Sequence, residues 1–194
     1  MKVGLTGGIG SGKTLVCSVL GKLGIAVYYA DSEARRLMNS DTELVRQISG
    51  LFGNKAYVGG ILNREFLAHR VFKDKELLTR LNELVHPAVR KDFSRWASEQ
   101  KPAFYVVEEA AILFESGSDL NMDLTVGVFA EKELRVRRVM QRDGITREQV
   151  LNRINSQMND EEKMEKADIV INNDGKNMIL PQIINMHNAI LKRG

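Results

Sequence analysis

The sequence has little cysteine, no long apolar run and no sorting signal that we recognise. One cysteine in 194 residues, Cys17, cannot form an internal disulfide, which favours a reducing compartment. A lone free cysteine usually packs as a small buried hydrophobe. No apolar stretch approaches the roughly 20 residues of a membrane-spanning helix, and the N-terminus lacks a signal peptide. We therefore expect a cytoplasmic protein with no membrane partner.

The sequence also lacks a large excess of either sign of charge. The net charge is only +3, the charged residues (27%) mix both signs, and no five basic residues follow one another. This mild excess suits anionic small molecules and does not indicate a nucleic-acid partner. His69, His86 and His187 lack the spacing of a zinc site, and no Ser-His-Asp arrangement is evident.

One segment does carry a strong signal for chemistry. Residues 7–14, GGIGSGKT, fit the phosphate-binding pattern G-x-x-x-x-G-K-[ST]. Its glycines let backbone N–H groups wrap a polyphosphate, Lys13 supplies a positive charge to the β- and γ-phosphates, and Thr14 can ligate Mg²⁺. An apolar run precedes the motif and a helical pattern follows it, which is the strand–loop–helix setting that such a loop requires.

Short β-rich runs alternate with helical segments along the chain. This alternation predicts an α/β protein with a parallel sheet covered by helices on both faces. The expected strands are residues 2–6, 25–29, 104–107, 124–129 and 169–171.

The segment from Asp31 to residue 102 reads as almost wholly helical. Ser40 and Glu43 form a predicted capping box, Asp74 is a predicted N-cap, and His86–Pro87 is predicted to begin a new helix. The segment adds little to a sheet core, but it can cover a substrate.

A second helical insertion lies between residues 130 and 167. A capping box is predicted at Thr146 and Gln149. Arg135, Arg138 and Arg142 fall on one helix face, where guanidinium groups can clamp phosphates. A solvated basic face is the alternative, and Arg142 is favoured as a clamp because a helix end follows it at Asp143–Gly144.

Carboxylates also end two of the expected strands. Asp31 follows the second strand and could deprotonate an attacking hydroxyl beside Mg²⁺, although it could equally cap a helix starting at Ser32. Glu108 and Glu109 follow the third strand; either could hold a magnesium-bound water, and we expect one of them to be merely solvated.

Taken in order, these features resemble the dephospho-CoA kinase family. The resemblance spans residues 3–175 and rests on several short matches: residues 5–13 (LTGGIGSGK), Ala30-Asp31 with Arg35, His86-Pro87 with Arg90, Leu113-Phe114-Glu115, Arg138 with Arg142-Asp143, Arg153 with Gln157, and Ala167-Asp168 followed by Asn172 or Asn173 and Gly175. Three positions depart from the family pattern, where Tyr29 replaces an aspartate, Ala111 a proline and Leu134 a glutamine.

The resemblance implies a three-layer α/β/α P-loop kinase with a five-stranded parallel sheet. Its core would comprise residues 1–31, 102–131 and 166–194, with a CoA-binding insertion at 32–101 and a lid at 132–165. The implied reaction phosphorylates the ribose 3′-hydroxyl of dephospho-CoA with ATP and Mg²⁺, giving CoA and ADP, in a monomer or weak oligomer.

The resemblance also assigns residues to roles. Asp31, Lys13 and Arg142 would be catalytic, and Thr14 would bind the metal. ATP would contact Gly8, Ile9, Gly10, Ser11, Gly12, Lys13, Thr14, Arg138, Arg142 and Asn173. Dephospho-CoA would contact Asp31, Arg35, His86, Arg90 and Glu115.

Two other functions stay open on sequence alone. One is another small P-loop kinase acting on a nucleoside, nucleotide or shikimate-like alcohol. The other is a nucleotide switch without kinase activity, although the guanine-recognition pattern Asn-Lys-x-Asp is incomplete at residues 54–57 (NKAY).

Overall fold

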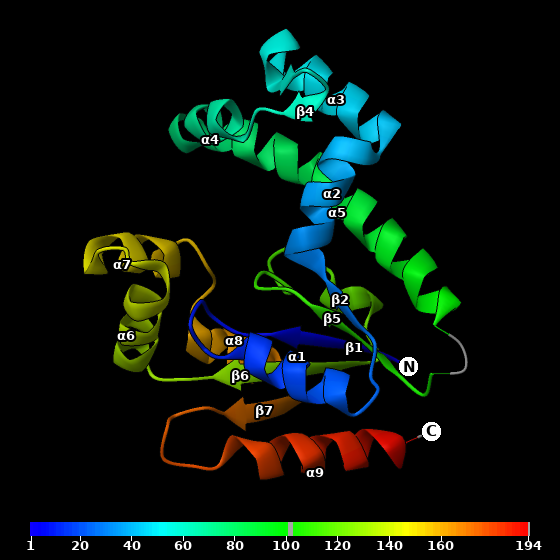
Figure 1. The fold of residues 1–194 in the computed structure, drawn as a ribbon, viewed down its shortest axis with the longest axis vertical. Coiled ribbons are helices and arrows are strands. Elements are labelled where there is room, and N and C mark those ends of the chain that lie inside the picture. Colours follow the sequence, from blue (N-terminus) through cyan, green and yellow to red (C-terminus); the bar gives the residue numbers. More distant parts are fainter. Residues whose placement is uncertain (101–102, 194) are drawn as a thin grey trace. The chain divides into compact units, whose positions relative to one another are not determined.

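A computed structural model describes residues 1–100 and 103–193, and the predicted boundary at residues 101 and 102 lies outside them, as does residue 194. The chain divides into two compact units (Figure 1). The first, here the sheet unit, comprises Met1–Tyr29 and Ala97–Gly194, and the second, here the helical unit, is Ala30–Trp96.

The sheet unit contains a five-stranded sheet in which every neighbouring pair is parallel. The strand order is β2-β5-β1-β6-β7. The strands are β1 (Lys2–Thr6), β2 (Val27–Tyr29), β5 (Val106–Glu109), β6 (Leu124–Phe129) and β7 (Ile169–Asn172). The predicted parallel sheet is therefore confirmed, and all five strands end at one edge, which is where such sheets bind ligands.

Two strands begin later than their sequences indicate. The ladder between β5 and β1 starts where Val106 pairs with Lys2, so Phe104 lies outside the strand and is 54% exposed. Likewise β2 begins at Val27, opposite Val107, rather than at residue 25. Residue type alone could not give these limits, because a strand extends only as far as its neighbour pairs with it.

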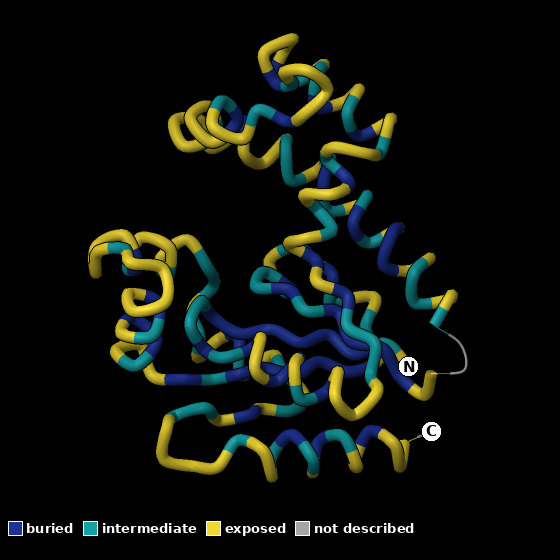
Figure 2. Tube along the Cα trace, viewed as in Figure 1, coloured by how far each residue is buried: buried dark blue, intermediate teal, exposed yellow. Residues whose placement is uncertain are grey.

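The main core lies between the sheet and two helices. Val3 and Leu5 of β1 pack with residues of α1 (Lys13–Lys22) and α9 (Ile179–Leu191) in one buried cluster, which also contains Cys17 as predicted. Figure 2 shows the strands as the most continuously buried part of the chain. The apolar residues alternate along β1, and this alternation directs one side of the strand toward these helices.

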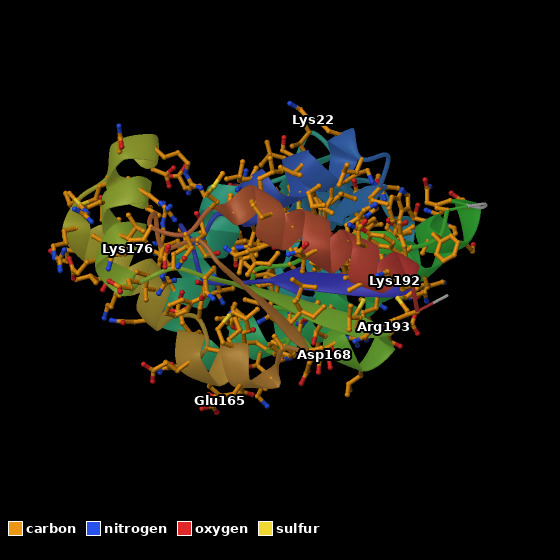
Figure 3. All side chains as sticks on the ribbon, turned by 90° about the horizontal axis from the view of Figure 1, so that it is seen from below. Lys22, Glu165, Asp168, Lys176, Lys192 and Arg193 are labelled. Atoms are coloured by element: carbon orange, nitrogen blue, oxygen red, sulfur yellow. The ribbon has the colours of Figure 1, made fainter. Side chains whose placement is uncertain are left out.

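The opposite face of the sheet uses glycine for close packing. A Cβ at Gly4 would meet the Leu113 side chain, and a Cβ at Gly127 would meet Met164 of α8 (Asp160–Lys166). Figure 3 shows α1, marked by Lys22, and α8, marked by Glu165, on opposite sides of the sheet. The three-layer α/β/α arrangement is thus confirmed. The remaining elements of the sheet unit are α6 (Lys132–Asp143), α7 (Arg147–Asn155) and a short 3₁₀ helix, η2 (Asp119–Asn121).

The helical unit is not wholly helical. It contains α2 (Ala30–Ser40), α3 (Thr42–Phe52), η1 (Asn54–Ala56), β3 (Tyr57–Val58), β4 (Ile61–Leu62), α4 (Arg64–Lys73) and all but the last three residues of α5 (Lys75–Glu99). The antiparallel pair β3-β4 turns at Gly59 and Gly60, which both have positive φ (59° and 81°). A Gly-Gly pair between β-branched and aromatic residues is a hairpin signal that the helical prediction overlooked.

The capping predictions had mixed outcomes. The Thr146–Gln149 capping box is confirmed, and the Asp74 carboxylate accepts from the Leu77 N–H as predicted (3.0 Å). The Ser40–Glu43 box is wrong, since Ser40 ends α2 and Asp41 caps α3 by accepting from a backbone N–H. Asp41 occupies the cap position because its backbone is extended there.

The prediction that a helix begins at His86–Pro87 is also wrong. Helix α5 runs through this dipeptide, with Pro87 inside it. Proline lacks the N–H that would bond to the carbonyl four residues earlier, and it normally ends a helix. Tertiary packing overrides that preference here, because Val85 and Val89 on either side of Pro87 are buried.

Replacing this proline should stabilise the protein. We expect Pro87→Ala to raise the free energy of unfolding by roughly 1–3 kcal/mol, because a helical N–H is regained and a ring clash is removed. Thermal unfolding measures the effect, and Lys91→Ala, one turn further along α5 and exposed, is the control. A fall in midpoint for Pro87→Ala alone would mean that the ring's rigidity or packing outweighs the lost hydrogen bond.

Candidate active site

The glycine-rich loop between β1 and α1 has a backbone that only glycine adopts readily. Gly7, Gly10 and Gly12 have φ values of 150°, 80° and 103°. A Cβ at Gly7 would meet the Val128 carbonyl oxygen, and one at Gly12 would meet the Asn173 side chain. The loop can therefore approach neighbouring backbone closely, and the N-terminus of α1 directly after it adds its positive dipole end to an anion site.

Lys13 folds back over this loop. Its Nζ donates to the Gly7 carbonyl oxygen (2.8 Å) and lies 3.6 Å from Oε1 of Glu109, and the lysine is largely buried. A desolvated ammonium beside a phosphate-binding backbone is a strong electrostatic contact for a transferring phosphoryl group. The hydroxyl-bearing Thr14 follows on α1 and is exposed.

The two glutamates of β5 differ from expectation. Glu109 is the last residue of the strand, and its side chain is 14% exposed. Glu108 is completely buried. The expectation that one of the two is merely solvated is thus wrong, because β5 is a central strand covered on both sides, and Glu109 is the one that reaches Lys13.

Asn173 joins three parts of the site. Its Nδ2 donates to the Ser11 carbonyl oxygen (2.7 Å), its backbone N–H donates to Phe129, and its Oδ1 accepts from Nη2 of Arg138 (3.4 Å). Arg138 also has a buried Nη1 with no hydrogen-bond partner among the described residues. Asn173 and Arg138, both predicted to contact ATP, therefore lie together beside the phosphate-binding loop.

Arg142 lies at the end of α6, which Gly144 terminates in a left-handed conformation as predicted. Its Nε donates to Oδ1 of Asp143 (2.7 Å), and Nη1 of Arg153 donates to the other oxygen of that carboxylate (3.0 Å). The Asp143 hydrogen bond raises the pKa of the Arg142 guanidinium, and the same pairing lowers the pKa of Asp143. Arg142 is 59% exposed at its side chain, so it is accessible to a ligand.

Arg135 has a different environment from the other two arginines of α6. It is buried, pairs with Asp160 and donates through Nη1 to the Ile9 carbonyl oxygen (3.3 Å). Burial lowers the pKa of its guanidinium, an effect that Asp160 opposes. Arg135 therefore holds the backbone of the phosphate-binding loop. Of the three arginines on this helix face, Arg138 and Arg142 remain as candidates for a phosphate clamp. Helical spacing could not distinguish them, because the partner Asp160 lies 25 residues away in sequence.

Glu115 braces two segments of the sheet unit. Its Oε1 accepts from the fully buried Lys163 Nζ (3.0 Å) and from the Met158 N–H (2.9 Å), and Lys163 also donates to the Ala111 carbonyl oxygen (2.9 Å). These bonds attach α8 to the segment after β5. The sequence analysis missed Lys163, since an isolated lysine in a charged helix reads as a surface residue.

The other predicted substrate residues belong to the helical unit. Asp31 lies in the first turn of α2 and is exposed, and Arg35 follows one turn later on the same helix face. The alternative that Asp31 caps a helix starting at Ser32 is wrong, because α2 already begins at Ala30. His86 and Arg90 are likewise one turn apart on α5, and burial, followed by the Arg90 charge, lowers the pKa of His86.

The site residues thus fall into two groups. Lys13, Thr14, Asn173, Arg138 and Arg142 belong to the sheet unit, whereas Asp31, Arg35, His86 and Arg90 belong to the helical unit. The chain connects the groups directly, since Asp31 comes two residues after Tyr29, the last residue of β2. No helix in the described part of the chain is long and apolar enough to cross a membrane.

Comparison with known proteins gives consistent results. The model of the family described as CoaE, dephospho-CoA kinase, matches residues 1–178. A dephospho-CoA kinase of Bacteroides fragilis is 39% identical over 186 residues, covering 96% of this chain and 91% of the relative. The structure of TT1252 from Thermus thermophilus has a TM-score of 0.84 and 38% identity, covering 100% and 97% of the two chains. Dephospho-CoA kinase from Campylobacter jejuni has a TM-score of 0.72 and 26% identity, covering 99% and 98%.

Proposed function

The chain belongs to the dephospho-CoA kinase family, and we propose from its geometry how its residues carry out that family's reaction. The protein phosphorylates dephospho-CoA with ATP, in the biosynthesis of CoA. The observation that carries this function is the glycine-rich loop with Lys13 folded over it and Glu109 beside it.

The transfer breaks the bond between the γ-phosphorus and the oxygen bridging to the β-phosphate. A bond then forms to the 3′-oxygen of the ribose, whose proton must be accepted by a base. We propose Asp31 as that base, because it is exposed and follows the β2 end that pairs with Glu109. Lys13 would offset the charge on the phosphoryl oxygens, and the loop amides, apart from that of Ile9, which donates to Gln157, would hold the β-phosphate.

The lid segment, residues 132–165, would supply further cations. Arg138 and Arg142 are proposed to contact the ATP phosphates together with Asn173, and a ligand can reach Arg142 because its side chain is mostly exposed. Arg35, His86 and Arg90 are proposed to contact dephospho-CoA. Glu115 is also proposed to contact dephospho-CoA, and its hydrogen bond from Lys163 would hold it in position.

Mg²⁺ is part of this proposal through Thr14. Mg²⁺ takes hard oxygen ligands and keeps water and phosphate oxygens in its shell, so a hydroxyl beside the phosphate-binding loop suits it. The Thr14 hydroxyl would hold the ion, which would neutralise charge on the β- and γ-phosphates.

We propose a cytoplasmic location, which the single free cysteine supports. That the protein is a monomer or a weak oligomer stays a prediction, which light scattering can test.

The experiment for the function is incubation with ATP, Mg²⁺ and dephospho-CoA, followed by detection of CoA by mass. Omission of the acceptor should abolish ADP formation. ADP formed equally fast without an acceptor would indicate a switch, and turnover only with a smaller alcohol would indicate another P-loop kinase.

The lid segment yields a prediction for Arg142. If this arginine meets the phosphates only when the lid closes, Arg142→Ala should lower kcat about tenfold or more while ATP affinity falls by less. Steady-state kinetics and ATP calorimetry measure the two quantities. Arg147→Ala is the matched control, since Arg147 is also an exposed, ion-paired arginine of the lid segment.

Two other outcomes would change this assignment. Equal losses in kcat and affinity would make Arg142 a residue that binds ATP in the ground state. An Arg142→Ala variant that behaves like Arg147→Ala would return Arg142 to an ordinary solvated surface arginine.

A further inference from the structure

Ile9, in the middle of the phosphate-binding loop, is held by the lid segment through all of its groups. Its N–H donates to Oε1 of Gln157 (3.0 Å), and its carbonyl oxygen accepts from Nη1 of Arg135 (3.3 Å). Its side chain packs against the small cluster of Val136, Val139 and Val150. The partners lie 126 and 148 residues away in sequence.

The two polar contacts differ in how firmly they are anchored. Arg135 is buried and fixed by its ion pair with Asp160, and a side chain at Gly8 would collide with both groups. Gln157 lies just beyond the end of α7, is half-buried, and contacts the loop through its amide oxygen. Gln157 is therefore the adjustable contact of the pair.

The loop has few bonds of its own to fix its shape. Within it, the Ser11 N–H donates to the Gly8 carbonyl oxygen (3.1 Å), and three glycines supply conformational freedom. Loop amides bind phosphate only when they point inward together, so ordering the loop before ATP arrives lowers the entropic cost of binding. A lid side chain that fixes the Ile9 amide contributes such ordering.

We propose that Gln157 is a positioning residue that couples the lid segment to the phosphate-binding loop by holding the Ile9 amide. Other side chains hold the Gly7, Ile9 and Ser11 carbonyl oxygens, whereas Gln157 holds the Ile9 N–H, so the loop is fully ordered for ATP phosphates while the lid segment keeps Gln157 in place. The effect on catalysis rests on the proposed kinase function, whereas the effect on the Ile9 amide and on ATP affinity does not.

Gln157→Met tests the proposal, because methionine keeps the length of the side chain and removes the acceptor. We expect hydrogen exchange of the Ile9 amide, followed by NMR, to accelerate at least tenfold. The ATP dissociation constant from calorimetry should rise about tenfold, because ATP must then supply the free energy that orders the loop. The KM for dephospho-CoA should stay within about twofold. Gln141→Met, at an exposed position of α6, is the matched control.

Gln157→Glu separates positioning from general stability. A carboxylate retains an acceptor oxygen at the same distance, so the Ile9 amide should regain its protection, while the added charge still weakens ATP binding. Unchanged Ile9 exchange or unchanged ATP affinity in Gln157→Met would overturn the proposal. So would accelerated exchange throughout α7 with a lowered thermal midpoint, which would indicate a structural role. A wild-type chain that binds ATP but makes no CoA would refute the kinase function alone.

Discussion

Replacing Asp31 with asparagine should lower the rate of phosphoryl transfer by about two to four decades, the usual range for loss of a general base. A ribose hydroxyl is a poor nucleophile unless it is oriented and its proton is accepted. Asparagine keeps the shape of the side chain but cannot take a proton. ATP affinity should change little, because the phosphate-binding loop and Lys13 belong to the sheet unit and stay intact.

The fold should tolerate this substitution. Asp31 lies in the first turn of α2, where a carboxylate contributes about 0.3–1 kcal/mol through the helix dipole. The transfer rate, thermal midpoint and ATP affinity are measured on the same preparation. Asp74→Asn is the control, because Asp74 also belongs to the helical unit and its side chain bonds to the Leu77 N–H.

One result would assign the base elsewhere. If Asp31→Asn retains near-normal turnover per folded molecule while its midpoint falls sharply, Asp31 is a structural residue of α2. Glu109 is then the next candidate, since it ends β5 and lies 3.6 Å from the Lys13 ammonium.

Lys13→Ala should lower kcat on the order of a hundredfold or more, equivalent to ~3 kcal/mol of transition-state stabilisation. The ammonium is largely buried between the Gly7 carbonyl oxygen and Glu109, so it is already positioned and desolvated for charge on a phosphoryl group. Its loss affects the transition state most, because charge on the transferring oxygens is greatest there.

The control for this substitution lies on the same helix. Lys22, in the last turn of α1, is exposed, so Lys22→Ala should leave kcat within about twofold. Circular dichroism establishes that both variants are folded before kinetics are compared. Near-normal turnover in folded Lys13→Ala would refute the role of the loop in phosphoryl transfer.

Much of the sheet unit could be predicted from short stretches of sequence. The G-x-x-x-x-G-K-[ST] motif is local, so eight consecutive residues (7–14) specify the loop, in which Gly7, Gly10 and Gly12 have positive φ, and the lysine that follows it. The parallel sheet was predictable for a similar reason. Each buried strand is a short run of β-branched and apolar residues, and helices separate the runs. Thr146 and Gln149 could also be paired, since a capping box spans only four residues.

The remaining features depend on contacts between residues that are far apart in the sequence. Arg135 and Arg138 are equivalent in helical periodicity, yet one pairs with Asp160 in the interior and the other reaches Asn173. Pro87 reads as a helix start, but buried neighbours keep α5 continuous. The physical reason is the same in each case. Local helix preferences contribute up to about three kcal/mol per residue and depend only on neighbouring residues. Whether a charged side chain can be buried depends instead on a partner that can be distant in the sequence. The contact between Gln157 and Ile9, 148 residues apart, exists only because the fold brings the lid segment to the loop.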